Sequence, residues 1–315
     1  MGEFQLIEWI RSRIGPNADD TIIGIGDDAA VLALPKDQEL VITTDTLNAG
    51  VHFDDGISAA DLGHKALAVN LSDLAAMGAT PRWVLLSISI PELDQPWLEE
   101  FVTGFLSLAE TFRVSLVGGD TCLGGLSISV TAIGQINAGM ALGRKGARPG
   151  DLIVVSGTLG DAALALSELR KCRIPDDSSL RALYLPLPRI ALGASLVGKA
   201  SACIDISDGL LADLGHIVNS SACGGILELD KLPASTALRC HETETQWTMQ
   251  LSGGEDYELC FSISPDREAE LQSLGKATGS ELSIIGRMVE GSGVVCVKPD
   301  GNFFELECTG YQHFT

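Results

Sequence analysis

The sequence predicts an α+β protein with two domains, in which each domain is a mixed sheet packed with helices. The chain has 315 residues, of which 45% are hydrophobic, and this is enough for two separate cores. Both halves combine antiparallel-looking strands with helices, which favours an α+β fold over a doubly wound parallel sheet. The segment KGARPGD ends the first half, and we therefore expect domains at residues 1–148 and 149–315.

The first half is expected to begin with a helix over residues 4–14, where the apolar side chains recur at helical spacing. The early acids of this segment argue against a signal or transit peptide. Further elements follow from the same patterns: strands at 39–44, 83–90, 115–117 and 126–135, and helices at 59–77 and 95–112. The uncharged segment 121–143 is interrupted by polar residues and glycines, so we interpret it as a buried strand and not as a membrane span.

The second half repeats this plan, and no short repeat or low-complexity segment interrupts it. The predicted elements are a strand at 152–156, helices at 160–169, 188–197 and 210–220, and strands at 225–229, 257–263 and 283–287. The mixture of element types in each half is what predicts the fold class.

The chain is acidic throughout. It has 42 Asp and Glu residues against 21 Lys and Arg, and the formal net charge of −21 is divided evenly between the halves. No basic stripe is present, which argues against a nucleic-acid partner. An acidic protein that binds an anionic substrate needs cations to bridge the like charges, so divalent metal is the natural interpretation of clustered aspartates.

The most informative stretch is IDISDGLLADLGHI, at residues 204–217. It places Asp205, Ser207 and Asp208 between an apolar run and an amphipathic continuation. A core helix would not crowd two carboxylates and a hydroxyl into its first turn, so the stretch indicates a binding site. Asp213 falls five residues beyond Asp208, and we expect it to be a solvated helix residue.

The same pattern recurs at the ends of other apolar runs. It occurs in GIGDDAA (Asp27, Asp28), ITTDTL (Thr43, Thr44, Asp45), NLSDLAAMGA (Ser72, Asp73), VGGDT (Asp120, Thr121) and SGGEDYEL (Glu255, Asp256). Hard oxygen ligands placed repeatedly at strand ends predict a shared site for Mg²⁺ and phosphates.

Several familiar active-site motifs are missing from the sequence. There is no GxxxxGK[ST], HRD, DFG, GxSxG or HExxH. The eight cysteines are never closer than 12 residues apart, which argues against a zinc site and favours small buried hydrophobic residues in a reduced cytosolic protein. Phosphoryl chemistry in this chain would therefore depend on carboxylate-held metals and a few cationic or backbone donors.

Nine motifs stand in a characteristic order along the chain: GIGDDAA, TTDTL, VHF, KALAVNLSDLAAMGA, GGDT, GRKGARPGD, DISDGLLADLGHI, GGEDYELCF and GYQHF. From Phe4 to Phe314 the chain resembles the thiamine-monophosphate kinase family, of the aminoimidazole ribonucleotide synthetase-like superfamily. The resemblance implies that superfamily's two-domain architecture, with ATP and metal binding and dimerisation in the N-terminal domain. It also implies a cytosolic homodimer, several Mg²⁺ ions and ATP-dependent phosphorylation of thiamine phosphate to thiamine diphosphate.

The resemblance further implies roles for individual residues. The implied metal ligands are Asp27, Thr43, Thr44, Asp45, Asp73, Asp120, Asp205 and Asp208. The implied ATP contacts are Gly119, Asp120, Arg144 and Ser207, and the implied contacts to thiamine phosphate are His52, Glu255 and Tyr311. A carboxylate and an aromatic face both suit the thiazolium cation of thiamine. No side chain is implied as a covalent nucleophile, and Asp28 and Asp54 receive no role.

Without the resemblance, these residues have simpler interpretations. Asp27 is typical of a solvated turn after glycine, and residues 43–45 are typical of a strand end with an Asx turn. Asp73 could cap a helix ahead of LAAMGA as readily as bind metal. The other simple interpretations are a tight turn at 118–120, a loop histidine at His52, a surface arginine at Arg144 and a core-filling residue at Tyr311.

Two rival functions remain open at this point. Another reaction of the same superfamily would use a different acceptor. Selenophosphate synthesis is disfavoured because its usual N-terminal reactive cysteine or selenocysteine has no counterpart before Cys122, and aminoimidazole ribonucleotide synthesis is disfavoured because GGEDYEL and GYQHF resemble the thiamine-phosphate branch. A non-catalytic nucleotide-binding protein would not need Glu255 and Tyr311. For the kinase we predict direct in-line transfer without a phosphoenzyme, because the acceptor is a phosphate monoester whose second pKa is about 6.

Overall fold

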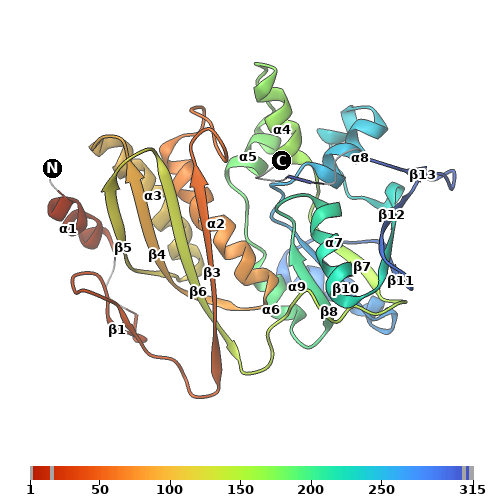
Figure 1. Ribbon diagram of the computed structural model, residues 1–315, viewed down its shortest axis with the longest axis horizontal. Helices are drawn as coiled ribbons and strands as arrows, with labels where there is room; N and C mark the ends of the chain where they lie inside the picture. Colours follow the sequence, from red (N-terminus) through yellow and green to blue (C-terminus); the bar gives the residue numbers. More distant parts are fainter. Residues whose placement is uncertain (1–2, 15–17, 307–309, 312–315) are drawn as a thin grey trace. The chain divides into compact units, whose positions relative to one another are not determined.

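The computed structural model describes residues 3–14, 18–306 and 310–311. The chain forms two compact units, which are described one after the other. Unit 1 comprises Met1–Leu74 and Ala79–Gly139, and unit 2 comprises Ala75–Gly78 and Met140–Thr315. Figure 1 labels most of the helices and strands of both units.

Unit 1 is built on a four-stranded sheet. Its elements are α1 (Glu3–Arg13), β1 (Thr21–Ile23), β2 (Val31–Leu32), β3 (Gln38–Asn48), α2 (Ala59–Ala76), β4 (Thr80–Ile90), α3 (Gln95–Phe112), β5 (Ser115–Leu123) and β6 (Ser127–Asn137). The strand order is β3-β6-β4-β5, with β6 antiparallel to both neighbours and β5 parallel to β4. β1 and β2 form a separate antiparallel pair.

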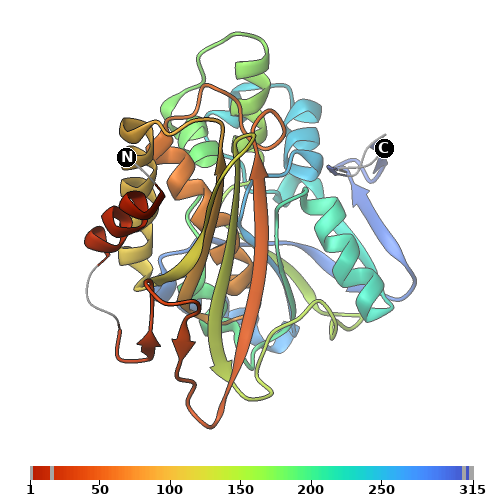
Figure 2. The same cartoon turned by 60° about the vertical axis from the view of Figure 1, so that its left-hand side comes forward.

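Helices α2 and α3 cover one face of this sheet (Figure 2). Along β6, Ile128, Val130 and Ala132 are buried, whereas Ser129 and Thr131 alternate with them and are only partly buried. Successive side chains of a strand point to opposite faces, so the sheet has one apolar face and one more open face.

A close contact between α2 and α3 depends on one glycine from each helix. A Cβ on Gly63 would lie 2.1 Å from the carbonyl oxygen of Phe101, and a Cβ on Gly104 would lie 1.9 Å from that of Ala60. The two backbones therefore approach too closely for a side chain at either position. This packing fixes α2, which carries Asp73, against its neighbouring helix.

Unit 2 is built on a seven-stranded sheet with the order β13-β12-β9-β11-β7-β10-β8. Its elements are β7 (Leu152–Ser156), α4 (Asp161–Arg170), α5 (Asp177–Tyr184), α6 (Ile190–Leu196), β8 (Ala200–Asp205), α7 (Leu210–Ser221), β9 (Gly224–Glu228), α8 (Thr243–Ser252), β10 (Leu259–Ile263), α9 (Glu268–Thr278), β11 (Leu282–Val289), β12 (Gly293–Val297) and β13 (Phe303–Phe304). Neighbouring strands are antiparallel, except that β12 is parallel to β9.

Both faces of the unit 2 sheet are covered at the central strand β7. Ile153 and Val155 of β7 enter one hydrophobic cluster and Val154 enters another. The first cluster includes residues of α7, and the second includes residues of α6 and α9. A strand that is buried on both faces has apolar side chains in succession, and this explains the apolar run LIVV in β7.

The predicted α+β class, with mixed sheets packed by helices, is confirmed. The strand predicted at 257–263 begins only at Leu259, because Tyr257 has a left-handed backbone with φ 49°. Six elements of unit 2 were not predicted: α5, α8, α9, β8, β12 and β13. Helix α8 buries only Gln250 and Leu251, so its sequence carries little helical periodicity.

The segment 121–143 contains the end of β5, all of β6 and a loop, and so it is not helical. Within the described part of the chain, no helix has both the length and the apolar character needed to cross a membrane.

Candidate functional site

Thr43 and Asp73 are candidate metal ligands that the structure brings together. The hydroxyl of Thr43, on β3, donates to Oδ2 of Asp73, on α2, at 2.5 Å. Asp45 lies two residues along β3 and therefore on the same face as Thr43. Its N–H donates to Oδ1 of the buried Asn70 at 3.0 Å. Thr43, Asp45 and Asp73 thus gather at the contact between β3 and α2.

Asp73 lies in the last turn of α2, which runs from Ala59 to Ala76. The alternative in which Asp73 caps a helix ahead of LAAMGA is therefore wrong, because an N-cap precedes its helix. A carboxylate near a helix C-terminus is disfavoured by the helix dipole, by about 0.3–1 kcal/mol. Helix stability gives no reason for an acid at this position, whereas a cation site does.

Thr44 differs from its neighbours because its side chain lies on the other face of β3. There its hydroxyl donates to the carbonyl oxygen of Val130 at 3.1 Å and accepts from the hydroxyl of Thr131 at 3.1 Å. A ligand role shared with Thr43 would have to use the main-chain oxygen of Thr44.

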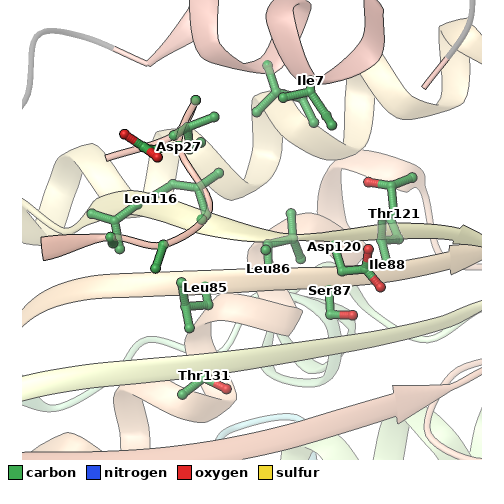
Figure 3. Close-up of a pocket in the computed structure, with 18 of the residues that line it drawn as sticks. Ile7, Asp27, Leu85, Leu86, Ser87, Ile88, Leu116, Asp120, Thr121 and Thr131 are labelled. Atoms are coloured by element: carbon green, nitrogen blue, oxygen red, sulfur yellow. The ribbon is translucent and has the colours of Figure 1, made fainter. Parts of the chain in front are cut away.

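A hollow of about 1080 Å³ in unit 1 contains Asp27 and Asp120 in its walls (Figure 3). Asp120 lies on β5 beside Ser87 of β4, its partner in the strand register. Asp27 lies toward the other end of the hollow and is exposed, with Oδ1 accepting the N–H of Asp28 at 2.9 Å. Apolar side chains such as Leu85 complete the walls, so the hollow combines carboxylates with an apolar surface.

Gly119 precedes Asp120 and cannot be replaced by another residue without a shift of the strand. Its φ is 151°, and a Cβ there would lie 1.8 Å from the carbonyl oxygen of Leu86. The absence of a side chain allows β5 to approach β4 this closely and leaves the backbone near Asp120 accessible to a ligand.

His52 and Arg144 both lie in loops. Nδ1 of His52 accepts the N–H of Asn48 at 3.0 Å, so the neutral ring carries its proton on Nε2. Arg144 is exposed, and its carbonyl oxygen accepts the hydroxyl of Ser221 at 3.2 Å. These positions agree with a loop histidine and a surface arginine, and they leave a binding role available to both.

In unit 2, three candidates lie between β8 and α7. Asp205 ends β8 and is buried, while Ser207 and Asp208 are half-buried. The prediction that Asp213 is a solvated helix residue is wrong, because it is only 3% exposed. Its Oδ2 accepts the N–H groups of Ser207, Asp208 and Gly209 at 2.9, 3.1 and 3.2 Å.

Burial is the main cause that raises the pKa of Asp213, to about 6, and the charge of Asp208 adds to this. The three backbone N–H groups act in the opposite direction, since they stabilise the ionised form. Asp213 is thus a buried acid that accepts hydrogen bonds from the backbone of residues 207–209.

Glu255 and Tyr311 are joined to the same loop through the main chain. The N–H of Glu255 donates to the carbonyl oxygen of Ser207 at 2.8 Å, and that of Tyr311 donates to the carbonyl oxygen of Asp208 at 3.1 Å. Tyr311 is 49% exposed, so the alternative in which it fills the core is wrong. The rest of the GYQHF motif after Tyr311 lies outside the described residues.

Glu255 and Tyr257 have left-handed backbones, with φ of 64° and 49°. Among the described residues, the other non-glycine positions with positive φ are Arg113, Cys172 and Ala222, which follow helix ends where this conformation is an ordinary cap. Glu255 and Tyr257 lie beyond the cap of α8. Strain of this kind costs about 1–3 kcal/mol per residue and is concentrated at functional sites.

The candidate ligands are suited to Mg²⁺. They are carboxylates and hydroxyls, the hard oxygen donors that this ion prefers. Over residues 3–14, 18–306 and 310–311, no group of three or more His, Cys, Asp or Glu side chains forms a ready metal centre. The donors are therefore distributed over separate segments and would need phosphate oxygens and water to complete the coordination.

The prediction of buried cysteines holds for only part of the set. Among those described, Cys203, Cys223, Cys260 and Cys296 are buried, and Cys122, Cys172 and Cys240 are exposed. All seven are free thiols, and Cys308 lies outside the described residues.

Two residues that position the candidates were missed. Asn70 is fully buried on α2, and a lone polar residue within the apolar run ALAVNL was the available signal. Asp213 lies in the first turn of α7, four residues after the N-cap Gly209 and one residue beyond the N3 position of a capping box, so that motif did not identify it. Lys65, also on α2, is 1% exposed, and no sequence motif predicted this buried charge.

Comparison with known proteins gives matches over nearly the whole chain. The model of the AIR synthase related protein, N-terminal domain, matches residues 26–136, and that of the C-terminal domain matches residues 148–298. A thiamine-monophosphate kinase of Salmonella typhimurium strain LT2 is 45% identical over 325 aligned residues, covering 99% of this chain and 98% of the relative.

Two solved structures are also similar. The crystal structure of thiamine-monophosphate kinase from Stenotrophomonas maltophilia K279a has a TM-score of 0.89 and 46% identity, covering 96% of this chain and 98% of that one. A structure of AaThiL complexed with AMPPCP and TMP has a TM-score of 0.79 and 33% identity, covering 99% and 97%.

Proposed function

The chain belongs to the AIR synthase related family and, within it, to the thiamine-monophosphate kinases, and we infer that it phosphorylates thiamine phosphate to thiamine diphosphate with ATP. The observation that carries this conclusion is the 45% identity to a thiamine-monophosphate kinase over 99% of the chain. The related AaThiL structure contains AMPPCP, an analogue of ATP, together with TMP, the acceptor.

We propose that the transfer uses several Mg²⁺ ions. The residues that would hold them are Asp27, Thr43, Thr44, Asp45, Asp73, Asp120, Asp205 and Asp208. The hydrogen-bonded Thr43–Asp73 pair supports this, because it places two hard oxygen donors 2.5 Å apart and fixes both against the sheet. When bound, Mg²⁺ supplies neutralisation of the phosphate charges that would otherwise repel each other.

The nucleotide phosphates would be held by Gly119, Asp120, Arg144 and Ser207. Gly119 offers a backbone unobstructed by Cβ, and the exposed guanidinium of Arg144 can form two parallel hydrogen bonds to phosphate oxygens. These contacts align the two substrates, and alignment is a main source of rate in phosphoryl transfer.

The acceptor would be bound by His52, Glu255 and Tyr311. A carboxylate and an exposed aromatic face can each stabilise the thiazolium cation, the aromatic contact by about 0.5–2 kcal/mol. The acceptor phosphate is largely ionised near neutral pH, since its second pKa is about 6. It can therefore attack directly, without a general base and without a phosphoenzyme.

We further propose a cytoplasmic homodimer that is formed through the N-terminal domain. Ile42 on β3 is 60% exposed and pairs in register with Ile133, and Leu40 beside it is 45% exposed. Apolar side chains exposed together on the open face of a sheet are typical of an interaction surface. The free thiols among the described cysteines agree with a reducing compartment.

The test is incubation with Mg-ATP and a panel of phosphate monoesters, followed by mass analysis of the products. We expect thiamine diphosphate and ADP in equal amounts, and little product from the other monoesters. Phosphorylation of a different acceptor would assign the chain to another reaction of its superfamily. Binding of Mg-ATP with no product from any acceptor would indicate a nucleotide-binding protein.

A further inference from the structure

Asp213 lies where the N-terminus of a helix ordinarily receives an anion. The chain enters α7 through the loop Ile206–Gly209, hereafter the 206–209 loop. N–H groups at such a position commonly bind phosphate. Here the three N–H groups of residues 207–209 donate to Oδ2 of Asp213 at 2.9–3.2 Å. The anion position is filled by a carboxylate of the chain itself.

Every main-chain polar group of the 206–209 loop has a partner within the chain. The Ile206 N–H donates to the carbonyl oxygen of Glu258 at 2.8 Å. The four carbonyl oxygens of the loop accept, in order, from the N–H groups of Tyr257 (2.8 Å), Glu255 (2.8 Å), Tyr311 (3.1 Å) and Asp213 (3.0 Å). Because the backbone is fully paired, the loop has no main-chain donor left for a phosphate.

We propose that Asp213 is a positioning residue: an internal anion that excludes phosphate from the N-terminus of α7 and holds Ser207 and Asp208 in place to bind the nucleotide and a divalent cation. The proposal rests on the proposed function of those two residues. The carboxylate of Asp213 neutralises the positive end of the helix dipole. Asp205, Asp208 and Asp213 then give the segment a negative charge with no Lys or Arg among residues 204–217.

The 206–209 loop also connects Asp213 to the acceptor residues. A Cβ on Gly254 or on Gly310 would lie 2.6 or 2.9 Å from a carbonyl oxygen of the loop, so the segments that carry Glu255 and Tyr311 pack directly on it. A displacement of the loop therefore moves both acceptor residues. Loss of Asp213 should weaken binding of the metal and of thiamine phosphate together.

The first arm of the test compares Asp213→Asn with the matched control Asp151→Asn in the full-length enzyme. Asp151 is another buried acid of unit 2, which accepts the N–H of Arg148 at 3.0 Å and the hydroxyl of Ser201 at 2.6 Å. The asparagine keeps an acceptor oxygen but loses the charge-assisted bonds. We expect the KM for thiamine phosphate and the Mg²⁺ concentration for half-maximal rate each to rise about tenfold in Asp213→Asn. The control should change neither.

The second arm uses Asp213→Ala and is independent of catalysis. In the presence of EDTA, inorganic phosphate should raise the melting temperature of this variant, because the three vacated N–H groups become available to an anion. Phosphate should not do so for the wild type or for Asp151→Ala. Formate should restore the activity of Asp213→Ala by occupying the same position.

The two arms separate the proposal from the function on which it rests. If the wild type makes no thiamine diphosphate but phosphate still stabilises only Asp213→Ala, the internal-anion role stands and the proposed function is wrong. If Asp213→Asn behaves as Asp151→Asn does, the positioning role is overturned, whether or not the alanine variant folds.

Discussion

Replacement of Asp73 by asparagine should separate folding from catalysis. The structure places Asp73 in the last turn of α2, so removal of its charge relieves an unfavourable dipole interaction of about 0.3–1 kcal/mol. The hydrogen bond from Thr43 becomes a neutral one, which loses about 1 kcal/mol. The two effects nearly cancel, and we expect the free energy of unfolding to change by less than about 1 kcal/mol.

Catalysis should respond far more strongly to the same substitution. If Asp73 binds metal, its loss removes charge stabilisation worth at least about 2.7 kcal/mol, which is a factor of about 10² in rate. The assay is formation of thiamine diphosphate at saturating Mg²⁺, combined with thermal unfolding of the same preparation. A stability change of 1 kcal/mol in a unit of this size corresponds to about 2–4 °C in melting temperature.

Asp61 provides the matched control for this experiment, since it is an acid at the other end of α2, in the first turn. Asp61→Asn removes a charge that the helix dipole favours, so it should slightly lower stability and leave turnover unchanged. Undiminished turnover in Asp73→Asn at saturating Mg²⁺ would refute the ligand role. A loss of stability that accounts for all of the lost activity would refute it as well.

Two further predictions rest on close contacts in the structure, and a third rests on the proposed acceptor contacts. Gly119→Ala should destabilise the protein by about 1–3 kcal/mol and lower ATP turnover, because its Cβ would lie 1.8 Å from a carbonyl oxygen. The control Gly125→Ala, whose Cβ would have nothing within 4 Å, should change neither stability nor turnover in the same denaturation and rate assays. Arg189→Met should lower the free energy of unfolding in urea by about 3–5 kcal/mol, because it leaves the largely buried carboxylate of Glu258 without its ion-pair partner. Adding a second substitution, Glu258→Gln, should recover part of this loss. A neutral-ring analogue of thiamine phosphate should be a poor acceptor in a steady-state assay, because it lacks the cation for the proposed acidic and aromatic contacts. If the analogue reacts as well as thiamine phosphate, the acceptor pocket has been assigned to the wrong residues.

The fold was predictable where periodicity is strong. The apolar alternation of β6 and the long apolar runs of α2 and α3 identified the main elements of unit 1. The β1–β2 pair was not predicted, and β5 (Ser115–Leu123) was predicted only over 115–117. Helix α8 was missed because it buries only Gln250 and Leu251, so its sequence carries little periodic signal. Helices α5 and α9 are more clearly amphipathic, and they were missed although this signal was present in the sequence.

The site was predictable as a set of residues but not as an arrangement. The helix predicted at 59–77 already placed Asp73 inside a helix, so the cap interpretation conflicted with that prediction, and α2 (Ala59–Ala76) decides against the cap. Asp213 was misjudged for a different reason: an acid on a helix is ordinarily solvated, and only the tertiary structure shows three backbone N–H groups converging on it. The left-handed conformation of Glu255 likewise left no mark in the composition of its segment.

The central claim is direct, metal-dependent transfer of phosphate from ATP to thiamine phosphate. The most direct test follows the label from γ-labelled ATP in a single turnover, with and without EDTA. We predict that label enters thiamine diphosphate in equal amount with ADP, that none is covalently attached to denatured protein when ATP is present alone, and that EDTA abolishes the transfer. Stoichiometric covalent label on the protein with ATP alone, or transfer that continues in EDTA, would contradict this account.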